Sequence, residues 1–131
     1  MDLGRVRIGL AVGESEFKIA TPRTAIAASG TLAKDAIAID EVARREEVDR
    51  IVVGQPVNSE DERMARVCGM LADSIRTLGW QVDLVDESFT SVQAEANLVQ
   101  SDLKGSDRRA RRDGEAAAII LERYFDGEAG A

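Results

Sequence analysis

The sequence predicts a single mixed α/β domain, and two observations carry that prediction. Stretches with the two-residue period of strands alternate with stretches whose apolar residues recur at helical spacing. The 131 residues suit one domain, and a composition of 44% hydrophobic and 31% charged residues is typical of a globular protein. No apolar stretch approaches the ~20 residues of a transmembrane helix. We expect the domain to cover residues 1–126 and residues 127–131 to form a frayed tail.

The first part of the chain predicts two strands and a helix. Residues 5–12 place apolar side chains on one face at period two, which is the pattern of a half-buried strand. Residues 17–27 form a second extended stretch, and Pro22 within it predicts a place at the sheet edge, where a missing N–H is tolerated. Apolar residues then recur at helical spacing over residues 31–47.

The second part repeats the alternation of strand and helix. A short apolar strand is expected over residues 49–53, an amphipathic helix over 64–78 and another strand over 80–85. A capping box predicts a further helix over 90–100. A polar, basic segment over 101–112 then leads into a last helix that ends at Tyr124.

The chain has no histidine and one cysteine. These counts exclude Ser-His-Asp and Cys-His catalysis, an imidazole base, a disulfide within the chain, and zinc sites built from histidine or several cysteines. The single Cys68 fits a reducing cytoplasm. Carboxylates remain for acid–base or metal chemistry, and they prefer hard cations such as Mg²⁺ or Mn²⁺. Any metal in this protein is therefore expected to be held by oxygen.

Three carboxylates stand out by position. Asp2 stands just before the first strand-like stretch, and Glu87 follows the strand over 80–85, at the edge where α/β sheets place ligands. Asp113 begins the apolar stripe of the last helix and is expected to face inward. Simpler interpretations stay open, because Glu87 also fits a solvated turn and Asp113 a helix start, where the macrodipole favours acids. Converging carboxylates would require a cation, but their spacing does not establish convergence.

Basic residues are concentrated in one segment. The net charge of −7 argues mildly against nucleic acid, yet residues 104–112 carry five basic residues and one acid, a local charge of +4. This run is either a solvated helix-capping face or a phosphate clamp. Arg7 is expected to extend the clamp, and Asn58 is either a turn residue or a donor to phosphate. The basic residues of the run are Lys104, Arg108, Arg109, Arg111 and Arg112.

Read in order, four segments resemble the motifs of the YqgF family. They are DLG at 2–4 with RIGLAV at 7–12, IVVGQPVN at 51–58, VDESFTS at 85–91 and DGEAAAIIL at 113–121. The family comprises proteins described as pre-16S rRNA nucleases and as Holliday-junction-resolvase-like proteins. The chain departs from the family at Ser88, where members generally have Arg, and at Gln55, where they have an apolar residue.

The resemblance implies a ribonuclease H-like fold, with a five-stranded mixed sheet flanked by helices. It maps a catalytic and metal-binding site onto Asp2, Glu87 and Asp113, with Glu115 as a fallback ligand. It also implies two-metal hydrolysis of phosphodiester bonds with Mg²⁺ or Mn²⁺. Because family members carry several apolar residues ahead of the Asp-x-Gly motif, we expect the first strand to be truncated at the N-terminus and the natural protein to start upstream of Met1.

The expected function is that of a hydrolase, a metal-dependent endonuclease that processes the 5′ end of pre-16S rRNA in the cytoplasm. Its expected partners are structured RNA and ribosomal precursor particles. One alternative is the same chemistry on a Holliday junction in DNA. Another is a non-catalytic RNA- or ribosome-binding protein that keeps the fold. Phosphate contacts carry no information about the sugar, so these residues do not separate RNA from DNA.

Overall fold

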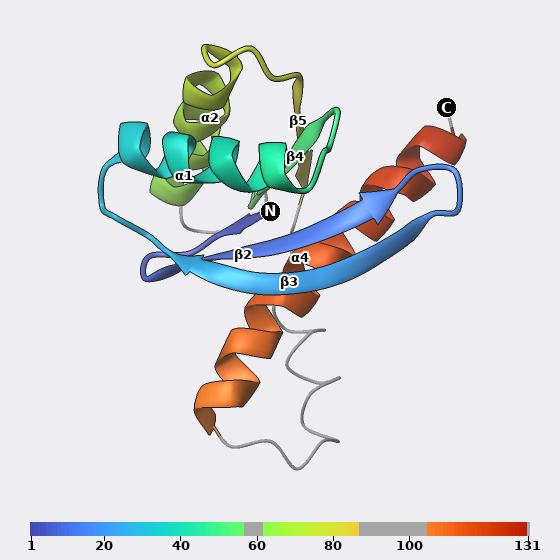
Figure 1. The fold of residues 1–131 in the computed structure, drawn as a ribbon, viewed down its shortest axis with the longest axis horizontal. Coiled ribbons are helices and arrows are strands. Elements are labelled where there is room, and N and C mark those ends of the chain that lie inside the picture. The colour runs from blue at the N-terminus through green and yellow to red at the C-terminus, as the bar shows by residue number, and fades with distance from the viewer. Residues whose placement is uncertain (57–61, 87–104, 131) are drawn as a thin grey trace.

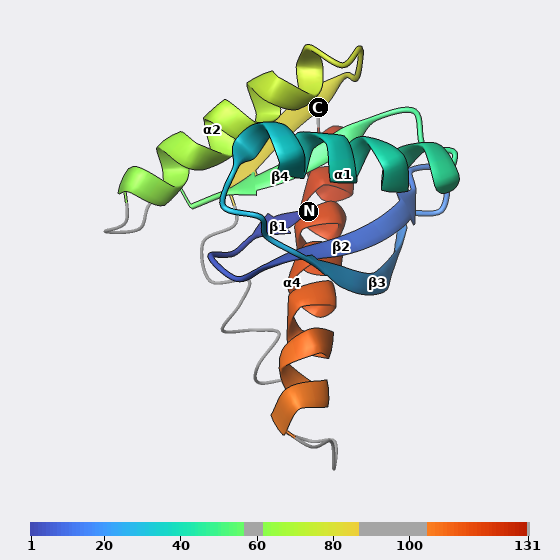
Figure 2. The ribbon, with the colours of Figure 1, turned by 60° about the vertical axis from the view of Figure 1, so that its left-hand side comes forward.

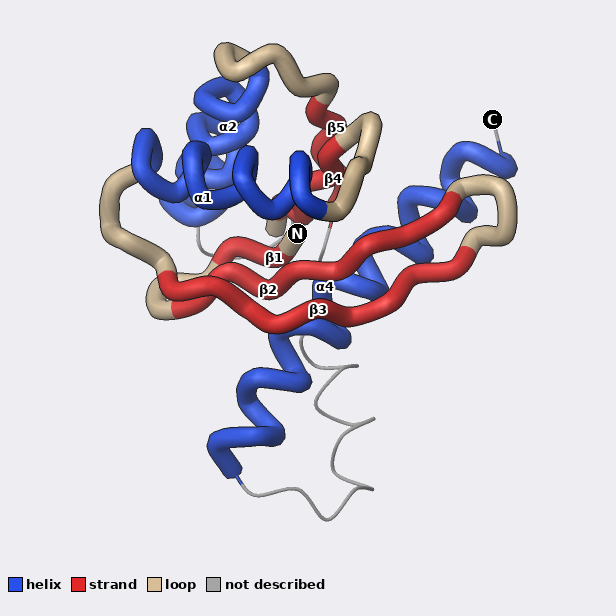
Figure 3. The backbone as a smooth tube through the Cα atoms, viewed as in Figure 1, coloured by secondary structure: helices blue, strands red, loops and turns tan. Residues whose placement is uncertain are grey.

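The fold alternates strands and helices from end to end (Figures 1 and 3). It was obtained as a computed structural model that describes residues 1–56, 62–86 and 105–130. The helix expected over 90–100 lies outside the described residues. The described elements are β1 (Asp2–Leu3), β2 (Arg7–Glu14), β3 (Ile19–Ala27), α1 (Leu32–Arg45), β4 (Ile51–Gln55), α2 (Glu62–Arg76), β5 (Val82–Asp86) and α4 (Gly105–Gly130).

Two groups of strands are joined at the start of the chain. β1, β2 and β3 pair antiparallel in that order, and β4 pairs parallel with β5. The ammonium group of Met1 donates to the Val52 carbonyl (2.5 Å), and the Gly54 N–H donates to the Met1 carbonyl (2.9 Å). Met1 thus bonds to β4 in the pattern of a parallel pair. Through these bonds the strands lie side by side in the order β3-β2-β1-β4-β5. Strand pairing divides them into a three-stranded and a two-stranded sheet, where one five-stranded mixed sheet was expected, because β1 contacts β4 only through Met1. Pro22 lies in the edge strand β3, as predicted.

Helices cover both faces of the sheet. α1 and α2 lie together on one face, and α4 crosses the other (Figures 1 and 2). The larger core lies beneath α1 and α2, where Ile8, Leu71 and Ile75 are fully buried. Successive strand residues point to opposite faces, so Val53 joins this core while Val52 packs with Ile120 beneath α4. Within the described part of the chain, none of the helices combines the length and apolar character of a membrane span.

β1 is much shorter than its neighbour β2. Its two residues pair with Ile8 and Gly9 only, so residues 10–14 of β2 continue past the point where β1 is paired. A cavity of about 1160 Å³ opens there between β2 and the start of β4. Side chains from both layers line it, among them Ile39 of α1 and Phe125 of α4. The centre of the sheet is therefore open at this end.

α4 is longer than the sequence predicted. The segment 101–112 was expected to precede the last helix, but the helix already begins at Gly105, so that boundary was wrong. Arginine is a good helix former, and the run contains no proline, so its charges do not interrupt the helix. The backbone also stays helical through residues 127–130, where we expected a frayed tail. β1 had no predicted bounds, and the other described helices and strands lie within about two residues of theirs.

Candidate active site

α4 lies in direct backbone contact with the sheet at Gly9 of β2. A Cβ atom placed on Gly9 would lie 2.2 Å from the backbone oxygen of Asp113, far inside van der Waals contact. The next helical residue, Gly114, is also close, since a Cβ there would lie 3.1 Å from the Arg23 carbonyl of β3. β3 has a bulge opposite Gly9. Two glycines thus allow the helix backbone to lie against the strands at Asp113.

Asp2 is brought to the same place by strand pairing. It is the direct partner of Gly9 across the β1–β2 ladder. Opposed residues of an antiparallel pair project to the same face, which here is the face that α4 covers. Asp2 is half-buried, and its side chain makes no hydrogen bond or ion pair with the described residues. The structure therefore brings two of the three predicted carboxylates, Asp2 and Asp113, next to the same glycine on one face of the sheet.

The Asp113 carboxylate has a partner that sequence reasoning did not supply. Arg7 lies two residues before Gly9 on β2, so its side chain projects to the same face. Its Nε donates to Asp113 Oδ2 at 2.5 Å, and the two side chains are 35% and 19% exposed. We predicted Arg7 as a phosphate contact, but here it forms a charge-assisted hydrogen bond with a predicted metal ligand.

The third predicted carboxylate, Glu87, lies outside the described residues. It follows Asp86, the last residue of β5, which pairs with Gln55 at the end of β4. Through Met1, β4 is the neighbour of β1, so β5 ends two strands away from Asp2, about 10 Å across the sheet. Among the described residues alone, no group of three or more acidic, cysteine or histidine side chains is close enough to hold a metal.

The predicted nucleic-acid contacts are placed only in part. Asn58 and Lys104 lie outside the described residues. The backbone of 108–112 forms helical turns of α4 directly before Asp113. Figures 1 and 2 show that this end of α4 projects beyond the sheet. Glu115, the fallback ligand, is half-buried and lies about 200° around the helix from Asp113, so it does not join the two carboxylates at Gly9.

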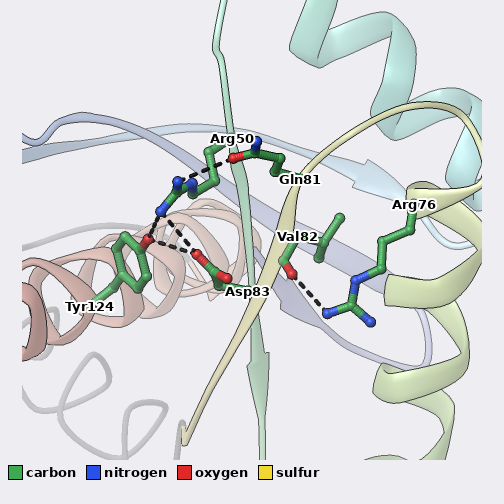
Figure 4. Close-up of polar contacts among 6 residues, drawn as sticks. All are labelled: Arg50, Arg76, Gln81, Val82, Asp83 and Tyr124. Carbon is green, nitrogen blue, oxygen red and sulfur yellow. Dashed lines mark hydrogen bonds and ion pairs between the residues drawn. The ribbon is translucent and has the colours of Figure 1, made fainter.

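Sequence reasoning also missed a polar cluster that fixes the other half of α4. Figure 4 shows Arg50 between Gln81, Asp83 and Tyr124. Arg50 donates to the Tyr124 hydroxyl (2.7 Å) and to Gln81 Oε1 (3.1 Å), and the hydroxyl donates to Asp83 Oδ2 (2.7 Å). Arg50 and Gln81 directly precede β4 and β5, and no local sequence pattern links them to Asp83 of β5 or to Tyr124 of α4. The cluster ties α4 to the parallel strands.

A comparison with known families decides where the chain belongs. The family model described as RuvX, Holliday junction resolvase, matches residues 1–127. The chain belongs to the RuvX family. This is the YqgF family that the motifs resemble. The match includes Asp2, Gly9 and Asp113, the residues that meet at the crossing of β2 and α4.

Curated relatives of this RuvX protein match along nearly the whole chain. A protein of Anaeromyxobacter dehalogenans strain 2CP-C is 41% identical over 134 residues, covering 98% of this chain and 96% of that one. A protein of Thermus thermophilus is 36% identical over 132 residues, covering 95% and 93%. Both carry the name "Putative pre-16S rRNA nuclease".

A solved structure with a similar fold is T. thermophilus RuvC in complex with Holliday junction substrate. The TM-score is 0.58 at 16% identity, and the match covers 98% of this chain and 92% of that one. At this identity the likeness concerns the fold, and it confirms the ribonuclease H-like architecture expected from the motifs.

Proposed function

We propose that this RuvX protein is a metal-dependent nuclease that hydrolyses phosphodiester bonds of structured RNA, namely the 5′ end of pre-16S rRNA in the cytoplasm. The observation that carries the proposal is the crossing of β2 and α4, at which both Asp2 and Asp113 adjoin Gly9. The names of the curated relatives support the reaction and the substrate. The ribosomal precursor particle is the partner in which that RNA occurs.

The donor set fits a hard divalent cation. Asp2 and Asp113 supply only oxygen, and the chain has no histidine. The side chain of Asp2 makes no bond with the described residues, which is costly for a half-buried carboxylate unless a cation or water satisfies it. Asp2 and Asp113, together with Glu87, would hold Mg²⁺ or Mn²⁺. Bound cations of this kind supply Lewis-acid activation of water and stabilise charge on the leaving oxygen.

The protein's own residues position the substrate. The basic run of α4 directly precedes Asp113, and a helix rises ~1.5 Å per residue, so the backbone of residue 108 is about 7.5 Å along the axis from the acidic site. Arginine and lysine in such a place hold phosphates and fix the register of the strand to be cut. The acidic remainder of the chain repels polyanions, which restricts binding to this end of α4.

A second candidate is the same hydrolysis on a four-way DNA junction. The description of the matching family as Holliday junction resolvase favours it. The chemistry and the acidic site are identical in the two proposals, so only the substrate distinguishes them.

One cleavage experiment tests the reaction and separates the substrates. The wild-type protein, Asp113→Asn and Asp73→Asn are incubated with a pre-16S rRNA fragment and with a four-way DNA junction, each in Mg²⁺ or in EDTA. Asp73 is the matched control, because it is a carboxylate paired with an arginine, Arg76, on the exposed face of α2. We expect RNA cleavage in Mg²⁺ by the wild type and Asp73→Asn, and loss of at least about 100-fold in Asp113→Asn.

Three results would count against parts of the proposal. Cleavage of the junction alone would favour the second candidate. Cleavage that survives both EDTA and Asp113→Asn would refute the carboxylate–metal site. Binding without cleavage under every condition would refute the nuclease and leave an RNA-binding protein.

A further inference from the structure

We propose that Arg7 is a positioning residue that holds Asp113 when no divalent cation is bound and passes to a substrate phosphate when the cation binds. The inference rests on the proposed function, since it concerns the same acidic site. It assigns one residue two alternating partners, the carboxylate of Asp113 and the phosphate of a nucleic acid.

The geometry supports the first of these partners. Arg7 and Gly9 project to the face of β2 that α4 covers, and the close approach at Gly9 brings Asp113 within reach of the Arg7 guanidinium. The bond from Arg7 Nε to Asp113 Oδ2 is 2.5 Å long. The Arg7 side chain is 35% exposed and the Asp113 side chain 19%, so both groups of the pair are in reach of solvent. A cation that binds Asp113 therefore binds a carboxylate that Arg7 already contacts.

The Arg7 guanidinium and a divalent metal ion compete for the Asp113 carboxylate because both are positively charged. A divalent ion binds a carboxylate oxygen at roughly 2.0–2.6 Å, which places it within about 5 Å of a guanidinium bonded to the other oxygen. Like charges at this separation repel strongly in a partly buried site, where salt screens them little. Arg7 therefore lowers the affinity of the site for metal as long as it stays on Asp113. By reciprocity, bound metal weakens the hold of Asp113 on Arg7 by the same factor.

The chemistry of arginine supports the second partner. The guanidinium stays charged and matches phosphate with two parallel N–H donors. Arg7 stands at the start of β2, beside the helix that carries the basic run just before Asp113. Once released, it adds a phosphate contact next to the acidic site. Metal and nucleic acid are then expected to bind cooperatively, so that the complete site assembles only on substrate.

The test is metal affinity in the absence of nucleic acid. Mn²⁺ binding to the full chain is measured by the electron paramagnetic resonance of free Mn²⁺ for wild type, Arg7→Gln and Arg23→Gln. Arg23 is a close control, because it is also a β-strand arginine, 38% exposed and paired with one carboxylate, that of Glu46 (3.1 Å). We expect Arg7→Gln to bind Mn²⁺ at least about tenfold more tightly than wild type and Arg23→Gln to match wild type.

Thermal unfolding and a charge-retaining variant separate the effect of the Arg7 charge from an effect of the substitution on folding. In EDTA, Arg7→Gln should melt at a lower temperature than wild type because Asp113 has lost its partner. Bound Mn²⁺ should remove this difference in melting temperature. Arg23→Gln should show no such recovery. Arg7→Lys keeps the charge and should bind Mn²⁺ close to the wild-type affinity, and this variant tests the charge argument even where Arg7→Gln folds poorly.

A second measurement examines the phosphate partner. The affinity for a labelled RNA duplex is measured by fluorescence anisotropy without metal and with Ca²⁺. Without metal, Arg7→Gln should bind within about threefold of wild type, and with Ca²⁺ it should bind about tenfold more weakly. Equal deficits in both conditions would show that Arg7 does not change partners.

The failures are distinguishable. If Arg7→Gln binds Mn²⁺ no more tightly than wild type, or if Arg7→Lys binds as tightly as Arg7→Gln, the role of Arg7 is refuted and the proposed nuclease stands. If neither wild type nor Arg7→Gln binds Mn²⁺, the metal site itself is refuted, and the role of Arg7 with it.

Discussion

Replacing Gly9 with alanine tests the contact on which the candidate active site depends. The new Cβ would lie 2.2 Å from the Asp113 carbonyl oxygen and 2.7 Å from its carbon, and both of those atoms belong to the backbone. No side-chain rotation relieves the overlap, so α4 must move away from β2 by about 1.2 Å to bring the 2.2 Å approach to the 3.4 Å of ordinary contact. Overpacking of this kind costs about 1–3 kcal/mol or more. A displacement of ~1 Å at a catalytic group costs roughly 100-fold in rate.

Urea unfolding followed by circular dichroism measures the first effect, and cleavage of the RNA fragment in Mg²⁺ measures the second. Gly127→Ala is the control on the same helix, since a Cβ there meets nothing within 4 Å. Alanine at this exposed helical position should leave cleavage unchanged and stabilise the protein by up to about 1 kcal/mol. Wild-type stability together with wild-type cleavage in Gly9→Ala would refute the crossing as the basis of the site.

Three further predictions concern stability. Tyr124→Phe should lower the free energy of unfolding in urea by about 1 kcal/mol, because it removes the hydroxyl that bonds to Asp83, and it should leave metal binding unchanged. The indole N–H of Trp80, followed by the neighbouring arginine on α1, holds the pKa of Asp40 below its ordinary value of 3.8. A carboxyl group whose pKa is lowered by folding stabilises the fold at any pH above its unfolded-state pKa, and this contribution is lost as the pH falls through its folded-state pKa. Trp80→Phe should therefore raise the pKa of Asp40 in an NMR titration and weaken the loss of stability in acid. An engineered extension of four or five alternating apolar residues ahead of Met1 should fill the open centre of the sheet and raise the free energy of unfolding by about 2 kcal/mol, whereas a Gly-Ser extension of equal length should not.

The alternation of strands and helices was predictable because local periodicity encodes it. The apolar stripe of α2 packs against one core, and the continuous apolar run of β4 is buried on both faces of the sheet, so neighbouring residues alone indicate each element. Pro22 likewise identified the edge strand, since only an edge tolerates its missing N–H. The start of α4 was misjudged because a run of charges resembles a loop in polarity while retaining high helix propensity.

The contacts that build the site were not predictable from periodicity. Arg7 and Asp113 are 106 residues apart, and nothing near either residue indicates the other. The motif resemblance identified the acidic residues but gave no reason for the glycines beside them. The structure supplies that reason, because Gly9 and Gly114 are the positions where a side chain would hold α4 away from β2 and β3.

α4 contacts β2 at two separate points, and the two contacts have different consequences. At Gly9 the helix backbone meets β2, and twelve residues later Phe125 meets the same strand at Gly13, where a Cβ would lie 2.8 Å from the ring. Tyr124 anchors this second contact to β5 through Asp83. Held at both points, the helix cannot tilt without losing one contact, but the backbone of Asp113 is placed directly by the contact at Gly9. Changes at the Tyr124 end should therefore reduce stability while cleavage persists, whereas changes at Gly9 should reduce both, because there the structural contact and the acidic site share the same backbone atoms.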